Sequence, residues 1–290
     1  MKMLFNDSMI ERTNIVDIED RGYQFGDGIY EVIGVYEGRT FLLDEHLQRL
    51  QRSASELRIS LPYTLENLKE KLIELVKVNE LNEGVIYLQV TRGTAERWHQ
   101  FPENTRPNLV AYTKEEEVMT ELEESGAKAV LTEDIRWLRC DIKTLNLLPN
   151  VLAKQKAIEN GAVEAIMHRG NIVTEGSASN VFIVKDGTVY THPANNYILN
   201  GITRQKVLEI CRKNKIAVHE ETFTVDDLFQ ADEVFITATK LDIIPIIQVN
   251  DQIIGNRKRG TVPESVPQHP RACIQQLVEK KLLENKYDVS

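Results

Sequence analysis

A lysine and a glutamate that follows it in the chain have the residue types and the surroundings for chemistry. Lys143 stands among mainly apolar residues in the strand-like stretch 141–146, and Glu175 lies in the segment 173–180. Burial disfavours an ammonium ion and lowers the pKa of its lysine, which leaves a neutral amine able to attack an aldehyde and form an imine. A carboxylate can keep an aromatic ring nitrogen protonated, so that the ring accepts electrons from a carbanion. Lys143 and Glu175 together predict a site for pyridoxal phosphate.

A third segment has the features of a phosphate site. In 199–210 a glycine turn opens a predicted helix, and the unpaired amide groups of the first helical turn, together with the helix dipole, favour an anion. Thr203 could either cap this helix or donate its hydroxyl to the anion. A hydroxyl-rich stretch, 237–239, follows the apolar strand 234–236. Both stretches also suit a structure without a ligand, as an ordinary helix start and as threonines that favour a strand.

The first half of the chain predicts an α+β unit that would position part of this chemistry. Apolar residues that recur every three or four positions predict a helix from Leu43 to Leu57, which Asp44 can cap, and a second helix over 65–79. Runs of strand-forming residues predict strands at 29–35, 85–90 and 109–112.

The second half of the chain contains more strand-forming residues. A helix is predicted over 149–160, closed by Gly161, where a residue free to adopt positive φ suits the end of a helix. Three hairpins are predicted, with turns at Gly170, at Asp186-Gly187 and at Asn250-Asp251; the Asp-Gly pair favours a type I′ turn. These elements predict a curved, barrel-like sheet flanked by helices, followed by a terminal helix over 271–285.

Length and composition predict two domains with well-packed cores, since the chain has 290 residues of which 42% are hydrophobic. An acidic run precedes the second block of strands, and we interpret it as a solvated linker. The expected division is a smaller N-terminal α/β domain at 1–117, a linker at 118–125 and a larger C-terminal domain at 126–290.

The composition also argues against several classes of function. A net charge of -9 disfavours nucleic acid and anionic membranes as partners, and no apolar run is long enough for a signal peptide core or a membrane span, so a cytoplasmic location is expected. The three cysteines lack metal-ligand spacing and are interpreted as packing residues, and no metal site is predicted. The stretch 26–28 lacks the third glycine of a dinucleotide loop, and 175–179 fails the pattern of a hydrolase nucleophile.

Five motifs in order and at similar spacing resemble the fold type IV pyridoxal phosphate enzymes, which comprise D-amino acid aminotransferases, branched-chain aminotransferases and aminodeoxychorismate lyases. The resemblance covers residues 3–255, and its motifs are 20–31, 45–50, 141–146, 173–180 and 200–204. It implies a two-domain α/β (α+β) architecture, a homodimer and pyridoxal 5'-phosphate as the cofactor.

The same resemblance implies roles for individual residues. Lys143 would bind the cofactor aldehyde and shuttle the proton between the substrate Cα and the cofactor C4′, and Glu175 would pair with the pyridine nitrogen. The remaining cofactor contacts are a packing residue against the ring and four residues that hold the phosphate: Leu199 for the ring, and Arg49, Ile202, Thr203 and Thr239 for the phosphate.

Within that family, residues 90–102 are most similar to the D-amino acid aminotransferases. There an arginine and a histidine, matched here by Arg97 and His99, cross the dimer interface and clamp the substrate α-carboxylate together with a tyrosine that matches Tyr30. Because a guanidinium grips a carboxylate through two charge-assisted bonds, the position of the clamp selects the stereoisomer whose Cα hydrogen faces Lys143.

The sequence therefore predicts transamination between D-amino acids and 2-oxo acids, with D-alanine and 2-oxoglutarate giving pyruvate and D-glutamate. The alternatives are a branched-chain L-amino acid aminotransferase, then an aminodeoxychorismate lyase, or a catalytically silent relative that binds a metabolite or a partner. Two departures from the family pattern bear on this choice. Ala178 stands where the family often has serine, and the chain after Gly255 does not follow the usual short ending.

Overall fold

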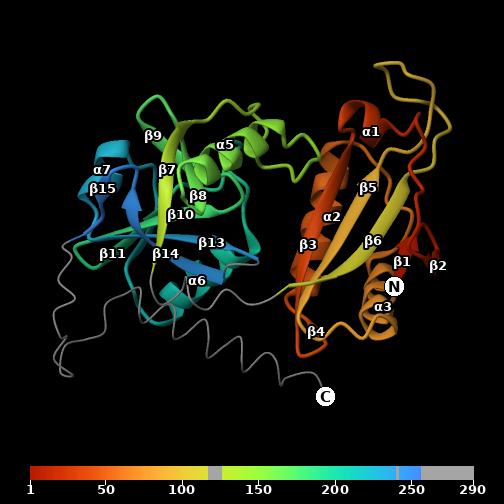
Figure 1. The fold of residues 1–290 in the computed structure, drawn as a ribbon, viewed down its shortest axis with the longest axis horizontal. Coiled ribbons are helices and arrows are strands. Elements are labelled where there is room, and N and C mark those ends of the chain that lie inside the picture. Colours follow the sequence, from red (N-terminus) through yellow and green to blue (C-terminus); the bar gives the residue numbers. More distant parts are fainter. Residues whose placement is uncertain (117–125, 240–241, 256–290) are drawn as a thin grey trace. The chain divides into compact units, whose positions relative to one another are not determined.

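The computed structural model describes residues 1–116, 126–239 and 242–255, which form two compact units (Figure 1). The first unit comprises Met1–Val118 together with Ile142–Leu147, and the second comprises the rest. Lys143 thus groups with the first unit, although the predicted division put 126–290 in one domain. The predicted linker at 118–125 and the predicted terminal helix at 271–285 lie outside the described residues.

The first unit is built on a six-stranded antiparallel sheet in the order β2-β1-β6-β5-β3-β4. Side chains alternate between its faces, so that Ile29, Ile33 and Val35 of the longest strand all point into the core. The strands are β1 (Lys2–Phe5), β2 (Ser8–Glu11), β3 (Gly28–Tyr36), β4 (Arg39–Thr40), β5 (Gly84–Thr91) and β6 (Asn108–Glu115).

Among the described residues of this unit, three helices accompany the sheet: α1 (Arg21–Phe25), α2 (Leu43–Glu56) and α3 (Leu65–Val78). The two long helices present their apolar stripes to the same core as the sheet, which confirms the predicted periodicity. The predicted cap was wrong: α2 begins after Leu42, whose φ is 51°, and no side chain caps it. Asp44 lies exposed in the first turn and binds Lys69 instead.

The second unit holds a nine-stranded mixed sheet in the order β12-β11-β10-β13-β14-β7-β8-β9, with β15 paired to β14. A flat sheet would keep β9 and β10 about 24 Å apart, five strand spacings of about 4.8 Å. The step from Gly176 to Asn180 that joins them spans at most about 14 Å, so the sheet must curl. The strands are β7 (Ala127–Glu133), β8 (Glu164–Arg169), β9 (Ile172–Gly176), β10 (Asn180–Lys185), β11 (Thr188–Thr191), β12 (Val218–Glu220), β13 (Glu233–Ala238), β14 (Asp242–Val249) and β15 (Gln252–Ile253).

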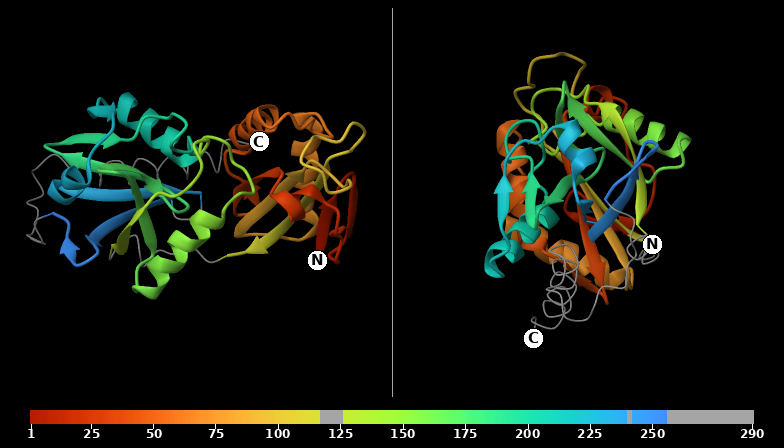
Figure 2. Two further views of the ribbon diagram at one scale, coloured as in Figure 1. Left: turned by 90° about the horizontal axis from the view of Figure 1, so that it is seen from above. Right: turned by 90° about the vertical axis from the view of Figure 1, so that its left-hand side faces the viewer.

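Helices α5 (Leu148–Glu159), α6 (Ile202–Lys213) and α7 (Val225–Gln230) pack against this curled sheet, which Figure 2 shows from two further directions. The three predicted hairpins are confirmed; at the type I′ turn, φ is 49° at Asp186 and 73° at Gly187. The predicted fold class, a smaller α/β part followed by a barrel-like sheet with helices, is confirmed. Within the described residues, none of the helices combines the length and apolar character needed to cross a bilayer.

Candidate active site

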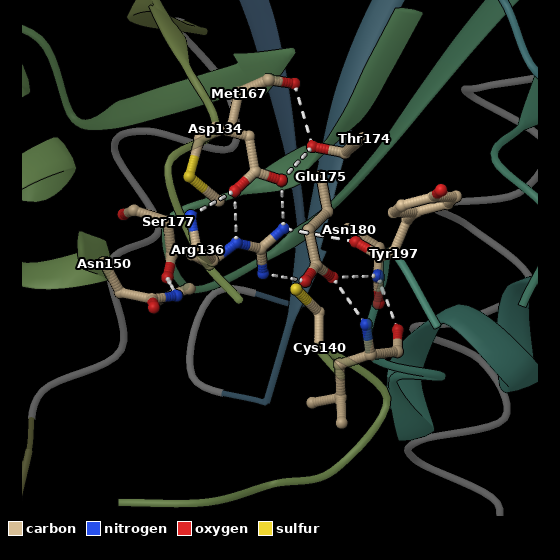
Figure 3. Close-up of polar contacts among 12 residues, drawn as sticks. Asp134, Arg136, Cys140, Asn150, Met167, Thr174, Glu175, Ser177, Asn180 and Tyr197 are labelled. Atoms are coloured by element: carbon tan, nitrogen blue, oxygen red, sulfur yellow. Dashed lines mark hydrogen bonds and ion pairs between the residues drawn. The ribbon is translucent and has the colours of Figure 1, made fainter. Parts of the chain in front are cut away.

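Glu175 lies buried near the end of β9, and its carboxylate accepts three hydrogen bonds (Figure 3). Arg136 Nη1 donates to one oxygen, while Asn180 Nδ2 at 2.9 Å and the backbone N–H of Leu199 at 3.0 Å donate to the other. Burial raises the pKa of Glu175 to about 7, because these donors offset only part of the loss of water. A carboxyl that titrates near neutral pH is well matched to hold or release a proton at an aromatic nitrogen.

Arg136 joins Glu175 to a second buried carboxylate, that of Asp134. It donates to Asp134 from Nε at 2.9 Å and from Nη2 at 2.8 Å, as a planar guanidinium fork can. Arg169 and Thr174 also donate to Asp134. Burial alone would raise the pKa of Asp134, but Arg136 and Arg169 lower it to about 2. The network therefore keeps Arg136 charged beside Glu175.

The turn that follows Glu175 is organised by another buried carboxylate, that of Glu164 on β8. Glu164 accepts from the backbone N–H and the hydroxyl of Ser177, from the hydroxyl of Ser179 at 2.8 Å and from the N–H of Ala178 at 3.4 Å. Ala178 itself is exposed. The departure from the family pattern at this position therefore leaves the Glu164 contacts in place.

Asn180 connects Glu175 to the start of α6. Its Nδ2 donates both to Glu175 and to the carbonyl of Leu199, at 2.8 Å. A Cβ on Gly201 would lie 2.2 Å from Asn180 Oδ1, so only glycine fits this close approach. The helix then begins at Ile202, with Gly201 as its N-cap and no side-chain cap bond. Thr203 is inside the helix and is not its cap, which settles the first of the two roles considered for it.

The predicted cofactor residues of the second unit are placed by these elements. Leu199 precedes α6, Ile202 and Thr203 form its first turn, and Thr239 follows β13. Their roles toward a cofactor stay predictions.

Lys143 is half-buried in the first unit and is held through its backbone. Its N–H donates to Ser53 Oγ at 3.3 Å, its carbonyl accepts from the N–H of Tyr30 at 3.1 Å, and its Nζ lies 4.3 Å from the centre of the Tyr30 ring. The expected strand around it is reduced to a single bridge between Thr144 and Ile29. Lys143 is therefore fixed beside β3, with an aromatic face next to its amine.

Arg49 lies in a buried ion pair with Glu31 of β3. Its Nε and Nη2 each donate to a different oxygen of Glu31 at 2.7 Å, and His46 Nδ1 donates to the second oxygen at 2.7 Å. Burial alone would raise the pKa of Glu31, but Arg49 and His46 lower it to about 2. The predicted contact of Arg49 with a phosphate remains a prediction.

The depressed pKa of Glu31 predicts a pH-dependent contribution to stability. Since its pKa falls from 4.5 to about 2 on folding, the contribution is complete above about pH 4.5 and is lost as the pH falls toward 2. The shift corresponds to about 3 kcal/mol. Denaturant unfolding of the wild type and Glu31→Gln between pH 7 and 2.5 should show free energies of unfolding that differ strongly at pH 7 and converge in acid. A constant difference would contradict this, and Glu70→Gln, at an exposed site of α3, is the control.

Arg97 and His99 lie exposed on the loop between β5 and β6, and the structure brings both against one ring. The Cζ atom of Arg97 is 4.9 Å from the centre of the Phe25 ring, and the His99 ring meets Phe25 edge-on at 5.8 Å. Neither side chain forms an ion pair with a carboxylate of the described residues. Both groups are thus free to bind an anion from outside this part of the chain.

Sequence reasoning gave no role to the side chains that bind Glu175, Arg136 and Asn180. It also missed Asp134, which binds Arg136, and Glu164, which binds the turn after Glu175. Their only local signal was an acid two positions before an arginine, a spacing that is common on protein surfaces. Lys143, Tyr30 and Arg49 belong to the first unit, and Glu175 and the start of α6 belong to the second.

Comparison with known proteins agrees with this combination of fold and site. The model of the amino-transferase class IV family matches residues 28–249. The chain belongs to this family, as the sequence motifs predicted, and the family is pyridoxal phosphate-dependent.

The chain is similar to curated D-alanine aminotransferases. It is 49% identical to that of Bacillus licheniformis over 92% of this chain and 94% of the relative, and 51% identical to that of Staphylococcus aureus strain MSSA476 over 85% and 88%. Among solved structures, a branched-chain amino acid aminotransferase from Escherichia coli superposes with a TM-score of 0.86 at 24% identity, covering 96% of this chain and 93% of that one. Another, from the archaeon Thermoproteus uzoniensis with norvaline, gives 0.83 at 25%, covering 99% and 96%.

Proposed function

We propose that this protein is a D-amino-acid transaminase that exchanges the amino group of D-alanine with 2-oxoglutarate, giving pyruvate and D-glutamate. The observation that carries the chemistry is the buried carboxylate of Glu175, which accepts hydrogen bonds from three donors. The choice of D-alanine is supported by the relatives, which are about half identical over most of the chain.

The residues present fit pyridoxal 5'-phosphate. When bound, this cofactor supplies an aldehyde for the amino group and a ring that withdraws electrons from the substrate Cα. Glu175 holds the proton of the pyridine nitrogen, and Leu199 packs against the ring. The amides at the uncapped start of α6 suit a phosphate, with Ile202, Thr203, Thr239 and Arg49 as its partners.

Lys143 binds the cofactor through its amine and moves a proton. With the cofactor bound, this amine would take the proton from the substrate Cα and deliver it to C4′. The backbone contacts of Lys143 with Ser53 and Tyr30 fix the origin of its side chain. The position from which the amine extends is therefore set by α2 and β3, independently of the substrate.

Arg97, His99 and Tyr30 bind the substrate α-carboxylate, the first two from the partner subunit. A carboxylate fixed on one side leaves only one enantiomer with its Cα hydrogen toward Lys143. In this proposal the enzyme selects D-amino acids by where it holds the carboxylate.

A homodimer is part of the proposal, and one helix supports it. Helix α5 buries only Ala153 and Ala157, while Leu148, Val151, Leu152 and Ile158 on its other side are 55–70% exposed. These four apolar side chains share one side of α5 with the exposed Gln155. Exposed apolar side chains gathered on one side of a helix favour burial against another protein, and a second copy offers the same side. Sedimentation together with activity at falling protein concentration tests this pairing; a monomer with full activity would contradict a clamp across subunits.

The stereochemical claim is tested by incubating the purified protein and pyridoxal phosphate with 2-oxoglutarate and either enantiomer of alanine. Pyruvate and D-glutamate should form from D-alanine, with at least about a hundredfold preference over L-alanine, because only one face of Cα meets Lys143. L-Leucine is the control for a branched-chain enzyme. Pyruvate from L-alanine alone, or faster turnover of L-leucine, would refute the proposal.

A further inference from the structure

The loop that carries Arg97 and His99 is hydrogen-bonded to a short segment near the start of the chain, residues 20–28. Two backbone bonds join the loop to this segment and its neighbour: the N–H of Arg21 donates to the carbonyl of Gly93 at 3.0 Å, and that of Ala95 donates to Glu19 at 3.2 Å. Asp20, the N-cap of α1, also accepts from the hydroxyl of Thr91 at 2.9 Å. The start of the loop is therefore fixed by two backbone hydrogen bonds and one side-chain hydrogen bond.

Arg21 reaches from this segment to the middle of the loop. Its side chain is buried, and its Nη1 donates to the carbonyl oxygen of Trp98 at 2.6 Å. Trp98 is the residue between Arg97 and His99. Since a guanidinium bond to a carbonyl is charge-assisted, this contact fixes the backbone from which both side chains leave.

Arg21 is itself held in place by Asp27. Asp27 accepts from Arg21 Nε at 2.8 Å and from Arg92 Nε at 2.8 Å and Nη2 at 2.9 Å. Arg92 in turn lies 3.7 Å from the centre of the Phe101 ring, two positions after His99. The loop is therefore tied on both sides of the Arg97 and His99 pair.

Phe25 supports the two side chains directly. Arg21 and Arg97 both lie against its ring, at 4.8 and 4.9 Å from the centre, and His99 meets it edge-on. A ring attracts cations to its faces, so Phe25 restrains Arg97 without using any of its N–H donors. Those donors stay available for a carboxylate.

We propose that residues 20–28 position the substrate clamp, with Arg21 fixing the backbone at Trp98 and Phe25 restraining Arg97 and His99. Arg21 and Phe25 are positioning residues, since neither is assigned a contact with substrate. The inference rests on the proposed function, which makes Arg97 and His99 carboxylate ligands. A clamp that is already ordered before binding avoids the entropy of ordering two long side chains, so its loss weakens substrate binding more than the chemical step.

Arg21→Lys and Phe25→Leu test this in the full-length holoenzyme. Lysine keeps the charge but lacks the planar fork that reaches Asp27 from Nε and Trp98 from Nη1, and leucine keeps apolar bulk without the ring face. We expect KM for D-alanine and for 2-oxoglutarate to rise together by about tenfold, with kcat within about twofold. Phe25→Tyr, which keeps the ring, should leave both KM values at the wild-type level. Tyr23→Leu, at a 73% exposed site on the same helix, is the matched control and should behave as wild type.

A second measurement does not depend on turnover. The chain has two tryptophans, so Trp137→Phe leaves Trp98 as a reporter of loop motion. Its fluorescence anisotropy should decay faster in Arg21→Lys and stay unchanged in Tyr23→Leu. Unchanged anisotropy and unchanged KM in both positioning variants would overturn the inference, as would a loss confined to kcat. A wild type inactive on D-alanine would refute the proposed function alone, since the anisotropy still decides whether the segment orders the loop.

Discussion

Replacing Lys143 with alanine is expected to reduce transamination by at least about a thousandfold while the protein stays folded. The loss combines the missing proton transfer with the missing covalent attachment of the cofactor. The fold should persist because Lys143 is half-buried and its hydrogen bonds to Ser53 and Tyr30 use backbone atoms, which alanine keeps. The side-chain contact that is removed, with the Tyr30 ring, is worth about 1 kcal/mol.

Steady-state kinetics and thermal unfolding of Lys143→Ala provide the two measurements. Lys69→Ala is the control, since Lys69 is a half-buried lysine of the same unit, like Lys143, and binds Asp44. A variant that keeps a tenth of the wild-type activity would rule out Lys143 as the proton carrier.

The second large effect is expected for Glu175→Gln, with kcat lowered by about a hundredfold or more. Glutamine preserves the shape of the side chain and can still accept from Leu199, but its amide cannot keep the pyridine nitrogen protonated. Arg136 retains its two bonds to Asp134, so its charge stays paired after the exchange. The variant should therefore fold and fail at the electron-withdrawing step.

Measurement of kcat together with the melting temperature separates a loss of catalysis from a loss of folding. Asp227→Asn is the matched control, because Asp227 is a carboxylate of the same unit in the first turn of α7. Its partners are Thr224, the N-cap of that helix, and Lys185 at the end of β10. It should lose at most about 1 kcal/mol of stability, the usual worth of a helix cap, with kcat unchanged. A Glu175→Gln variant with wild-type kcat would show that the pyridine nitrogen has another partner or needs none.

Local patterns in the sequence were enough to predict most of the helices, strands and turns. Helices α2 and α3 follow from apolar residues at three- and four-residue intervals, and the Asp186-Gly187 turn follows from the positive φ that both residues tolerate. The prediction that Asp44 caps α2 was wrong because the N-cap is Leu42, which adopts a φ of 51°. This conformation is imposed by the surrounding fold and not by the preference of leucine.

The sequence by itself determined which groups are available for chemistry, namely Lys143, Glu175, Arg97 and His99, because residue type and order along the chain carry that information. Only the tertiary structure decided what holds them. Arg136 meets Glu175 from 39 positions away, Arg21 meets Trp98 from 77 and Arg49 meets Glu31 from 18. Such contacts depend on how strands pair and how the second sheet curls, and hydrogen bonds and burial between distant residues leave no periodic trace in the sequence.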